Sequence, residues 1–113
     1  SIIGEYDLLI SDIYVLTDDV DLPLGSIRIR PKGGDGCHRG LENIIYNLQS
    51  NAFSRIRLGI AGRDYKRPSE KYVMKPFNDE MILDAKIMVN RAADAMQSII
   101  TRGLNRTMNQ FNA

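Results

Sequence analysis

The sequence has a single cysteine, Cys37, and a single histidine, His38. One cysteine cannot form an internal disulfide bond, and one Cys with one His is too small a set to build a zinc site. We therefore expect an intracellular protein that holds no metal. No apolar run approaches the roughly 18 to 20 residues needed to span a bilayer, so a membrane-spanning protein is not indicated.

The N-terminus also lacks the features of a secretory signal. Its first residues have neither a basic region nor a sustained apolar stretch, and the chain does not begin with Met. We therefore expect the chain to be a fragment or a processed product. What is present is typical of one globular domain over residues 1–113, with 43% hydrophobic residues, 26% charged residues and a formal net charge of +1.

The small net charge conceals an uneven distribution of charge along the chain. Residues 1–24 contain six acidic residues and no Lys or Arg, whereas residues 28–75 contain eleven basic residues and four acidic ones. A basic segment of this kind is expected of a protein that binds a phosphate backbone. A solvated surface would have the same composition, so charge alone leaves both interpretations open.

Hydrophobic periodicity predicts alternating strands and helices. We expect a helix ending near residue 10, strands at 13–16, 27–30 and 54–60, and helices at 41–48 and 79–101, with loops at 17–25 and 61–71. The last helix has an apolar stripe and ends at Gly103, and a further helical turn could follow in the tail. The stripe comprises Ile82, Ala85, Met88, Val89, Ala92, Met96, Ile99 and Ile100.

This alternation predicts an α/β fold with a mainly parallel or mixed sheet covered by helices. Three strands make a narrow sheet, and we expect a stretch preceding Ser1 to supply its central strands.

Two segments carry residues suited to chemistry. A glycine-rich loop, Gly33 to Gly40, joins a strand to a helix, so that backbone N–H groups and the positive helix end can face an anion or a polar substrate. The loop has neither the Gly-Lys-Ser/Thr of a P-loop nor a G-x-G-x-x-G spacing, so nucleotide binding is not indicated. Cys37 has no second His to activate it, which argues against a cysteine nucleophile.

An acidic segment precedes this loop, with carboxylates at Asp18, Asp19 and Asp21. An Asp close to a His orients it in general-base catalysis, and His38 lies on the glycine loop. Loop carboxylates and a His before a helix also serve as caps, so the spacing alone does not decide between these roles.

Three motifs together resemble the bacterial-type peptidyl-tRNA hydrolase family. They are Asp18-Asp19-Val20-Asp21-Leu22-Pro23-Leu24-Gly25 followed by Arg28 and Arg30, then Gly33, Gly36, His38 and Gly40, then Phe53-Ser54-Arg55-Ile56-Arg57-Leu58-Gly59-Ile60. The resemblance runs from about Ile13 to Phe77, with a compatible helix to Ile100. It implies a three-layer α/β/α globule that needs no cofactor and cleaves the ester between a peptide and the 3′ end of tRNA, recycling tRNA in translation.

The resemblance also implies roles for particular residues. Asp18 matches the catalytic Asp that holds the family's His general base, and Asp21 lies in the segment beside the cleft that acts as its gate. Arg28 and Arg57 match the two basic positions that clamp a phosphate of the tRNA acceptor stem.

Further residues of the resemblance surround the cleft. His38 matches a cleft His that is not the base, and Gly36 belongs to the same loop. Arg39 stands where the family has Asn, and Arg63 falls in the lid loop.

A second interpretation follows from what the resemblance lacks. The family's catalytic His and cleft Asn residues lie upstream of the matched region, and Arg39 replaces an amide that both donates and accepts hydrogen bonds. The alternative is a non-catalytic RNA-binding relative in a ribosomal or other ribonucleoprotein assembly. In either case the expected partner is RNA, and the expected location is the cytoplasm or, alternatively, the mitochondrion.

Overall fold

The computed structural model describes residues 9–36, 38–61 and 78–112, which contain three strands and three α-helices. In chain order the elements are the 3-10 helix η1 (Ile10–Asp12), the strands β1 (Tyr14–Pro23) and β2 (Ile27–Arg30), the helix α2 (Arg39–Leu48), the strand β3 (Ser54–Ala61), and the helices α3 (Asp79–Arg102) and α4 (Leu104–Phe111). The sheet order is β1-β3-β2. β1 runs parallel to β3, and β2 runs antiparallel to it.

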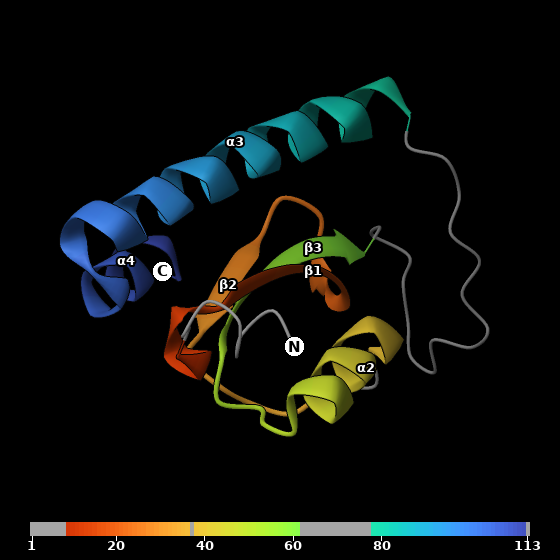
Figure 1. The fold of residues 1–113 in the computed structure, drawn as a ribbon. Coiled ribbons are helices and arrows are strands. Elements are labelled where there is room, and N and C mark those ends of the chain that lie inside the picture. The colour runs from red at the N-terminus through yellow and green to blue at the C-terminus, as the bar shows by residue number, and fades with distance from the viewer. Residues whose placement is uncertain (1–8, 37, 62–77, 113) are drawn as a thin grey trace.

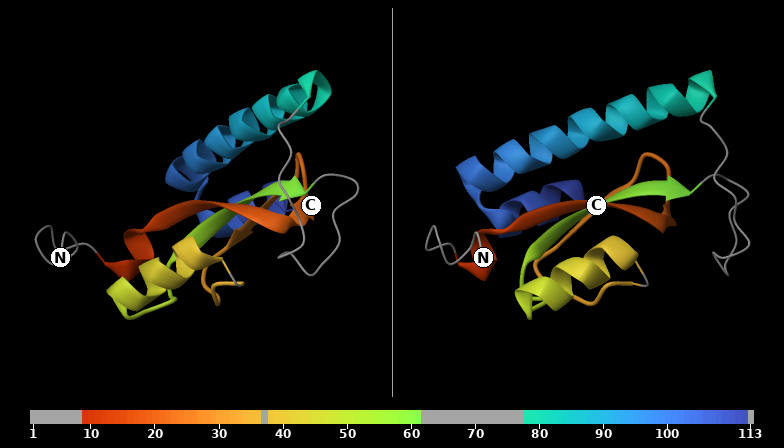
Figure 2. Two further views of the ribbon diagram at one scale, coloured as in Figure 1. Left: turned by 90° about the vertical axis from the view of Figure 1, so that its right-hand side faces the viewer. Right: turned by 45° about the vertical axis from the view of Figure 1, so that its right-hand side comes forward.

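The helices lie on both sides of this sheet. Figures 1 and 2 show α2 on one face and α3 on the other, with α4 folded back beside β2. The predicted α/β class and the layered arrangement with a mixed sheet are therefore confirmed. In the described strands the parallel pairing of β1 with β3 joins seven residue pairs, and the antiparallel pairing of β2 with β3 joins four.

The hydrophobic core lies between the sheet and α3. Ile27, Ile29 and Ile56 are buried on one face of the sheet and pack with buried residues of the helices, among them Met88 and Ile99. The alternation of Ile and Arg in β2 and β3 explains this, because successive side chains of a strand point to opposite faces. The apolar face makes the core and the basic face is turned toward α2.

The apolar stripe of α3 is only partly buried. The helix itself is confirmed, and Met88, Ala92 and Ile99 are buried, but Ile82 is 40% exposed and Ile100 is 82% exposed. A helix of 24 residues is about 36 Å long, whereas the eight residues of β3 span about 26 Å. Because the helix is longer than the sheet it covers, periodicity predicts which residues form the apolar stripe, but it does not predict which part of the stripe the sheet buries. Val89, also predicted for the core, is likewise exposed.

The acidic segment was expected to be a loop, and this prediction is wrong. β1 continues through it to Pro23, because the backbone of Asp18 and Asp19 pairs with Leu58 and Gly59 of β3. A bulge follows between Asp19 and Pro23. A Cβ at Gly59 would lie 2.0 Å from the carbonyl oxygen of Pro23, so only glycine lets the two strands approach so closely.

The end of the chain is fastened to the edge strand β2. The Ile29 N–H donates to Asn112 Oδ1 at 2.7 Å, and Asn112 Nδ2 donates to the Ile29 carbonyl at 3.0 Å. Arg28 also donates from its guanidinium to the Asn112 carbonyl at 2.7 Å. The tail that was predicted to add a helical turn is therefore the docked helix α4.

Some predictions fall outside the described residues. Of the helix expected to end near residue 10, only residues 9 and 10 are described: Leu9 is extended, and Ile10 begins η1. The loop predicted at 61–71 is described only at Ala61, the last residue of β3. Among the helices of the described ranges, none is long and apolar enough to cross a membrane.

Candidate functional site

His38 and Asp18 meet at the point where the glycine loop enters α2. His38 Nε2 lies 2.7 Å from Asp18 Oδ1, although twenty residues separate them in the sequence. The side chain of Asp18 is 58% exposed and that of His38 is 30% exposed. The pair is therefore accessible from solvent while being fixed by hydrogen bonding.

The position of His38 as the N-cap of α2 fixes its tautomer. Its Nδ1 accepts the backbone N–H of Leu41 at 3.2 Å, and an atom that accepts a backbone N–H carries no proton itself. The neutral ring then carries its proton on Nε2 and donates it to Asp18. Because both ring nitrogens are engaged in this way, His38 has no free lone pair with which to take a proton from water.

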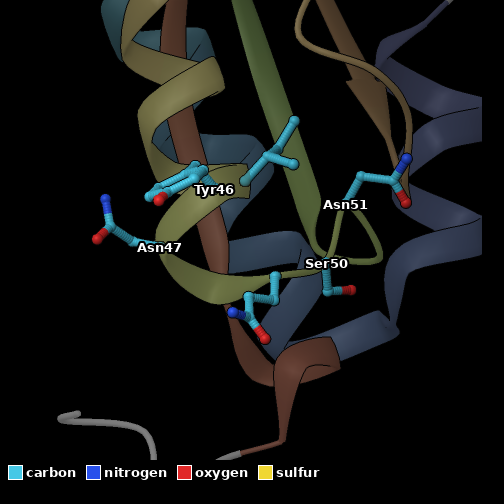
Figure 3. Close-up of a pocket in the computed structure, with 6 residues that line it drawn as sticks. Tyr46, Asn47, Ser50 and Asn51 are labelled. Carbon is cyan, nitrogen blue, oxygen red and sulfur yellow. The ribbon is translucent and has the colours of Figure 1, made fainter.

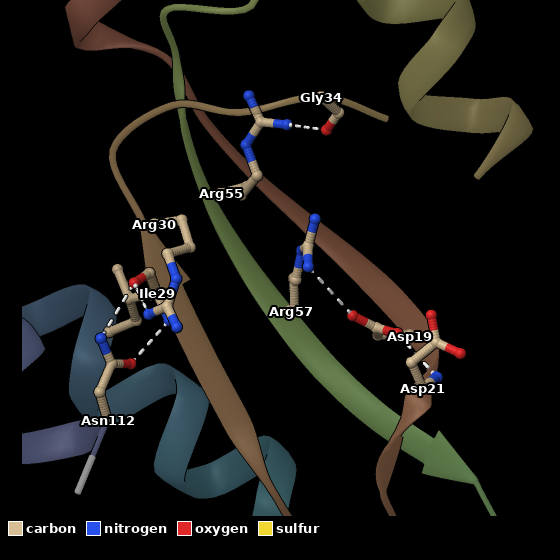
Figure 4. A network of polar contacts seen from close by, with 8 residues as sticks. All are labelled: Asp19, Asp21, Ile29, Arg30, Gly34, Arg55, Arg57 and Asn112. Atoms are coloured by element: carbon tan, nitrogen blue, oxygen red, sulfur yellow. Dashed lines mark hydrogen bonds and ion pairs between the residues drawn. The ribbon is translucent and has the colours of Figure 1, made fainter. Parts of the chain in front are cut away.

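The glycine loop passes over two arginines of β3. Arg55 donates from Nη1 to the Gly34 carbonyl at 2.8 Å, as Figure 4 shows. Gly36 has a φ of +56°, and a Cβ there would lie 3.5 Å from Nη2 of Arg57. That distance is an ordinary van der Waals contact, so the left-handed backbone is what favours glycine at this position.

Arg55 is fully buried, which is rare for an arginine. Besides Gly34 it donates to the carbonyls of Asn51 at 2.8 Å and Phe53 at 3.2 Å, and it lies 4.5 Å from the centre of the Phe53 ring. Burial lowers the pKa of the Arg55 guanidinium, and the positive charge of Arg57 lowers it further. Its Nε has no hydrogen-bond partner within the part of the chain that the structure describes. Arg55 therefore fastens the start of the glycine loop to the segment before β3.

The two proposed phosphate ligands are neighbours in the sheet. Arg28 of β2 pairs in register with Arg57 of β3, and residues directly opposite each other in an antiparallel pair point to the same face. Arg30 pairs in the same way with Arg55, and Arg30 is exposed. The structure thus brings the predicted residues Arg28 and Arg57 together, with Arg30 on the same face.

Asp19, the next carboxylate of β1, lies beside Arg57. Asp19 Oδ2 is 3.6 Å from Arg57 Nη1, and Asp19 Oδ1 accepts the backbone N–H of Asp21 at 2.8 Å (Figure 4). Asp19 is the more buried partner of the ion pair, since its side chain is 13% exposed against 31% for Arg57. The side chain of Asp19 therefore links the bulge of β1 to the arginine face.

Two further residues were predicted for the site, Arg39 and Arg63. Arg39 occupies the first position of α2 and is exposed, where its charge is unfavourable to the helix dipole. Arg63 lies outside the described residues. Across residues 9–36, 38–61 and 78–112, no group of three or more His, Cys, Asp or Glu is placed to hold a metal ion.

An open hollow of about 520 Å³ lies at the other end of α2 from His38. Figure 3 shows it lined by Tyr46, Asn47, Ser50 and Asn51, with Ile45 and Gln49 completing the wall. It contains no charged side chain, and we assign it no role in the chemistry.

Comparison with known proteins identifies the family. The family profile described as "Peptidyl-tRNA hydrolase" matches residues 1–113. The chain belongs to the peptidyl-tRNA hydrolase family. A peptidyl-tRNA hydrolase of Geobacillus thermodenitrificans is 40% identical over 111 residues, which cover 98% of this chain and 60% of that protein. A peptidyl-tRNA hydrolase of Persephonella marina is 33% identical over 112 residues, which cover 99% of this chain and 59% of that protein.

A solved peptidyl-tRNA hydrolase shares the fold. The crystal structure of the Acinetobacter baumannii protein superposes with a TM-score of 0.82 over 99% of this chain and 57% of that one, at 24% identity. The chain therefore spans about three fifths of the length of these peptidyl-tRNA hydrolases.

Two features of this family member were not predicted from its sequence. The first is the burial of Arg55, because an alternating pattern shows which face a residue occupies but not how deeply it lies. The second is the ion pair of Asp19 with Arg57. That pair depends on the register of β1 against β3, in which Thr17 lies beside Arg57 and Asp19 is two residues further along the same face, and nothing in the sequence shows this register.

Proposed function

We propose that the complete protein hydrolyses the ester linking a peptide to the 3′ end of tRNA, and so returns tRNA to translation. The observation that supports this best is the Asp18–His38 pair beside an arginine face, in a chain of the peptidyl-tRNA hydrolase family. The proposed substrate places the enzyme in the cytoplasm or, alternatively, in the mitochondrion.

In this proposal Asp18 orients the general base. Its Oδ1 accepts from His38, and its Oδ2 has no hydrogen-bond partner among the described residues. A carboxylate with one oxygen fixed and the other open can accept the N–H of a second imidazole and stabilise it when that ring takes a proton from water. His38 then acts as a positioning residue, and the base is a His outside residues 1–113.

The arginine face supplies the contact to RNA. A guanidinium binds a phosphate through two N–H groups and reads no base, which suits an enzyme that serves many tRNAs. We assign this role to Arg28 and Arg57, as the resemblance implies. Since one donor of Arg28 is held by Asn112, its orientation depends on α4.

We further propose that residues 1–113 are the C-terminal part of a longer domain. Leu16 is 47% exposed on β1, the outer strand of the described sheet, and the N-terminal half of α3 exposes Leu83, Ile87 and Val89. Apolar surface of this kind is usually covered in a folded protein. An upstream segment that pairs with β1 and covers this end of α3 would account for the difference in length from the relatives.

The test is Asp18→Asn in the complete protein. We expect ester cleavage of peptidyl-tRNA to fall by about 10²- to 10⁴-fold, because the base loses its orienting charge. Binding of tRNA should remain nearly unchanged, because the asparagine oxygen can still accept the hydrogen bond from His38.

The matched control is Asp84→Asn, which removes one exposed carboxylate from α3 and should leave cleavage as it is. If Asp18→Asn loses binding and cleavage equally, Asp18 has no specific part in the chemistry.

One observation favours the second candidate function, an RNA-binding relative without catalysis. Arg39 adds an exposed positive charge at the start of α2, next to His38, where a phosphate contact would offset its unfavourable interaction with the helix dipole. The partner would then be a ribosomal or other ribonucleoprotein RNA. In that case Asp18→Asn should change little, and the unmodified complete protein should bind tRNA without cleaving it.

A further inference from the structure

The contact between Arg57 and Asp19 is an unusual one for a phosphate-binding arginine. The two side chains lie 3.6 Å apart, which is within the range of an ion pair but longer than the 2.7 to 2.9 Å typical of a charge-assisted hydrogen bond. Arg57 is therefore attracted to Asp19, but its N–H groups are not used in hydrogen bonds to that carboxylate. An incoming phosphate can still form a bidentate contact with Arg57.

Asp19 cannot easily move away from that phosphate. Its Oδ1 accepts the backbone N–H of Asp21, and its backbone pairs with Gly59 of β3. These contacts hold the carboxylate next to the bulge, and its side chain is mostly buried. A phosphate that binds Arg57 therefore lies beside the fixed negative charge of the Asp19 carboxylate.

We propose that Asp19 is a specificity-determining residue that competes with phosphate for Arg57. This inference rests on the proposed function, because it concerns the arginine assigned to the RNA phosphate. A lone phosphate gains the Arg57 contact but loses part of it to repulsion from Asp19. An RNA backbone also reaches Arg28 and the exposed Arg30 on the same face, so it can overcome that repulsion through several contacts at once.

Asp19→Asn in the complete protein tests this role. Asparagine keeps the oxygen that accepts the Asp21 N–H and removes only the charge. We expect the variant to bind a minihelix RNA of the tRNA acceptor stem about three-fold more tightly at low salt, with the gain disappearing in high salt. Inorganic phosphate, used as a competitor of the RNA, should inhibit the variant at a lower concentration than it inhibits the unmodified protein.

Two controls separate competition from other causes. Glu42→Gln removes an exposed carboxylate from the first turn of α2 and should leave RNA affinity unchanged. In an Arg57→Ala background, Asp19→Asn should give no gain in RNA affinity, because the arginine for which Asp19 and phosphate compete is then absent.

The outcomes are distinguishable. If Glu42→Gln tightens binding as much as Asp19→Asn, or if the gain persists without Arg57, the competitor role is wrong and only net charge matters. If Asp19→Asn binds RNA no more tightly than the unmodified protein, the role is also wrong. If the unmodified protein does not bind the minihelix at all, the proposed function is wrong, and the role of Asp19 that rests on it is wrong as well.

Discussion

The surroundings of Arg55 and Arg57 differ sharply, although the two residues lie two positions apart on the same face of β3. Arg55 is fully buried and donates to three carbonyl groups. Arg57 is partly exposed, and its recorded contact is the long ion pair with Asp19. One guanidinium is enclosed by the fold and the other is open to a ligand.

This difference shows how the same side chain can be structural or functional within one strand. The burial of a charge is costly unless hydrogen bonds compensate for it, and Arg55 has such bonds on two of its three nitrogens. An arginine that binds phosphate must instead keep N–H groups that are not hydrogen-bonded within the protein. The glycine loop spans both regions, because Gly34 contacts the first arginine and Gly36 lies over the second.

The largest effect should come from replacing the enclosed arginine. Arg55→Met keeps an unbranched apolar stem but removes the guanidinium and leaves three carbonyl groups without their donor, and we expect a loss of about 3 kcal/mol in the free energy of unfolding. Urea denaturation of the complete protein measures it. Arg57→Met is the matched control and should cost less than about 1 kcal/mol. Equal losses at both positions would remove the distinction between the two arginines.

A smaller effect is expected in the glycine loop that joins the two regions. Gly36→Ala places a side chain at a φ of +56°, which L residues rarely adopt, so we expect it to destabilise the protein by about 1 kcal/mol. Gly34→Ala has open space around it and should be neutral or stabilising by about 0.5 kcal/mol. Thermal denaturation of both variants gives the comparison, and the same sign for both would contradict the loop geometry.

The smallest effect concerns the open arginine and its partner across the strands. Arg57→Ala and Arg28→Ala should each weaken binding of tRNA a few-fold and reduce the slope of log affinity against log salt by about one. Binding titrations at several salt concentrations measure this slope, with the exposed Lys86→Ala on α3 as the control for charge alone. A slope that stays unchanged in both arginine variants would argue against the phosphate clamp.

Much of the fold could be predicted from periodicity. The alternation of Ile27 and Ile29 with arginines predicted β2 and its buried face, and the spacing of Met88, Ala92 and Ile99 predicted α3. These predictions succeeded because the pattern reflects which side of an element is removed from water.

The rest depended on partners distant in sequence. The acidic segment has the composition of a loop, yet its backbone forms strand β1 because Gly59 of β3 allows the close approach. The site was predicted in part, since the sequence marked both Asp18 and His38 but assigned Asp18 to another His. The structure shows that His38, while capping α2 through Leu41, is turned toward Asp18.

The side-chain amide of Asn112 acts on Ile29 as the backbone of a neighbouring strand would, by accepting its N–H and donating to its carbonyl (Figure 4). Exposed strand edges are templates on which chains aggregate, and natural proteins block them with a bulge, a charge or a covering segment. Here a single amide near the end of the chain occupies the hydrogen-bonding groups of Ile29 at the edge of β2. Asn112, the residue that ends α4, thereby blocks this position of the β2 edge to another strand.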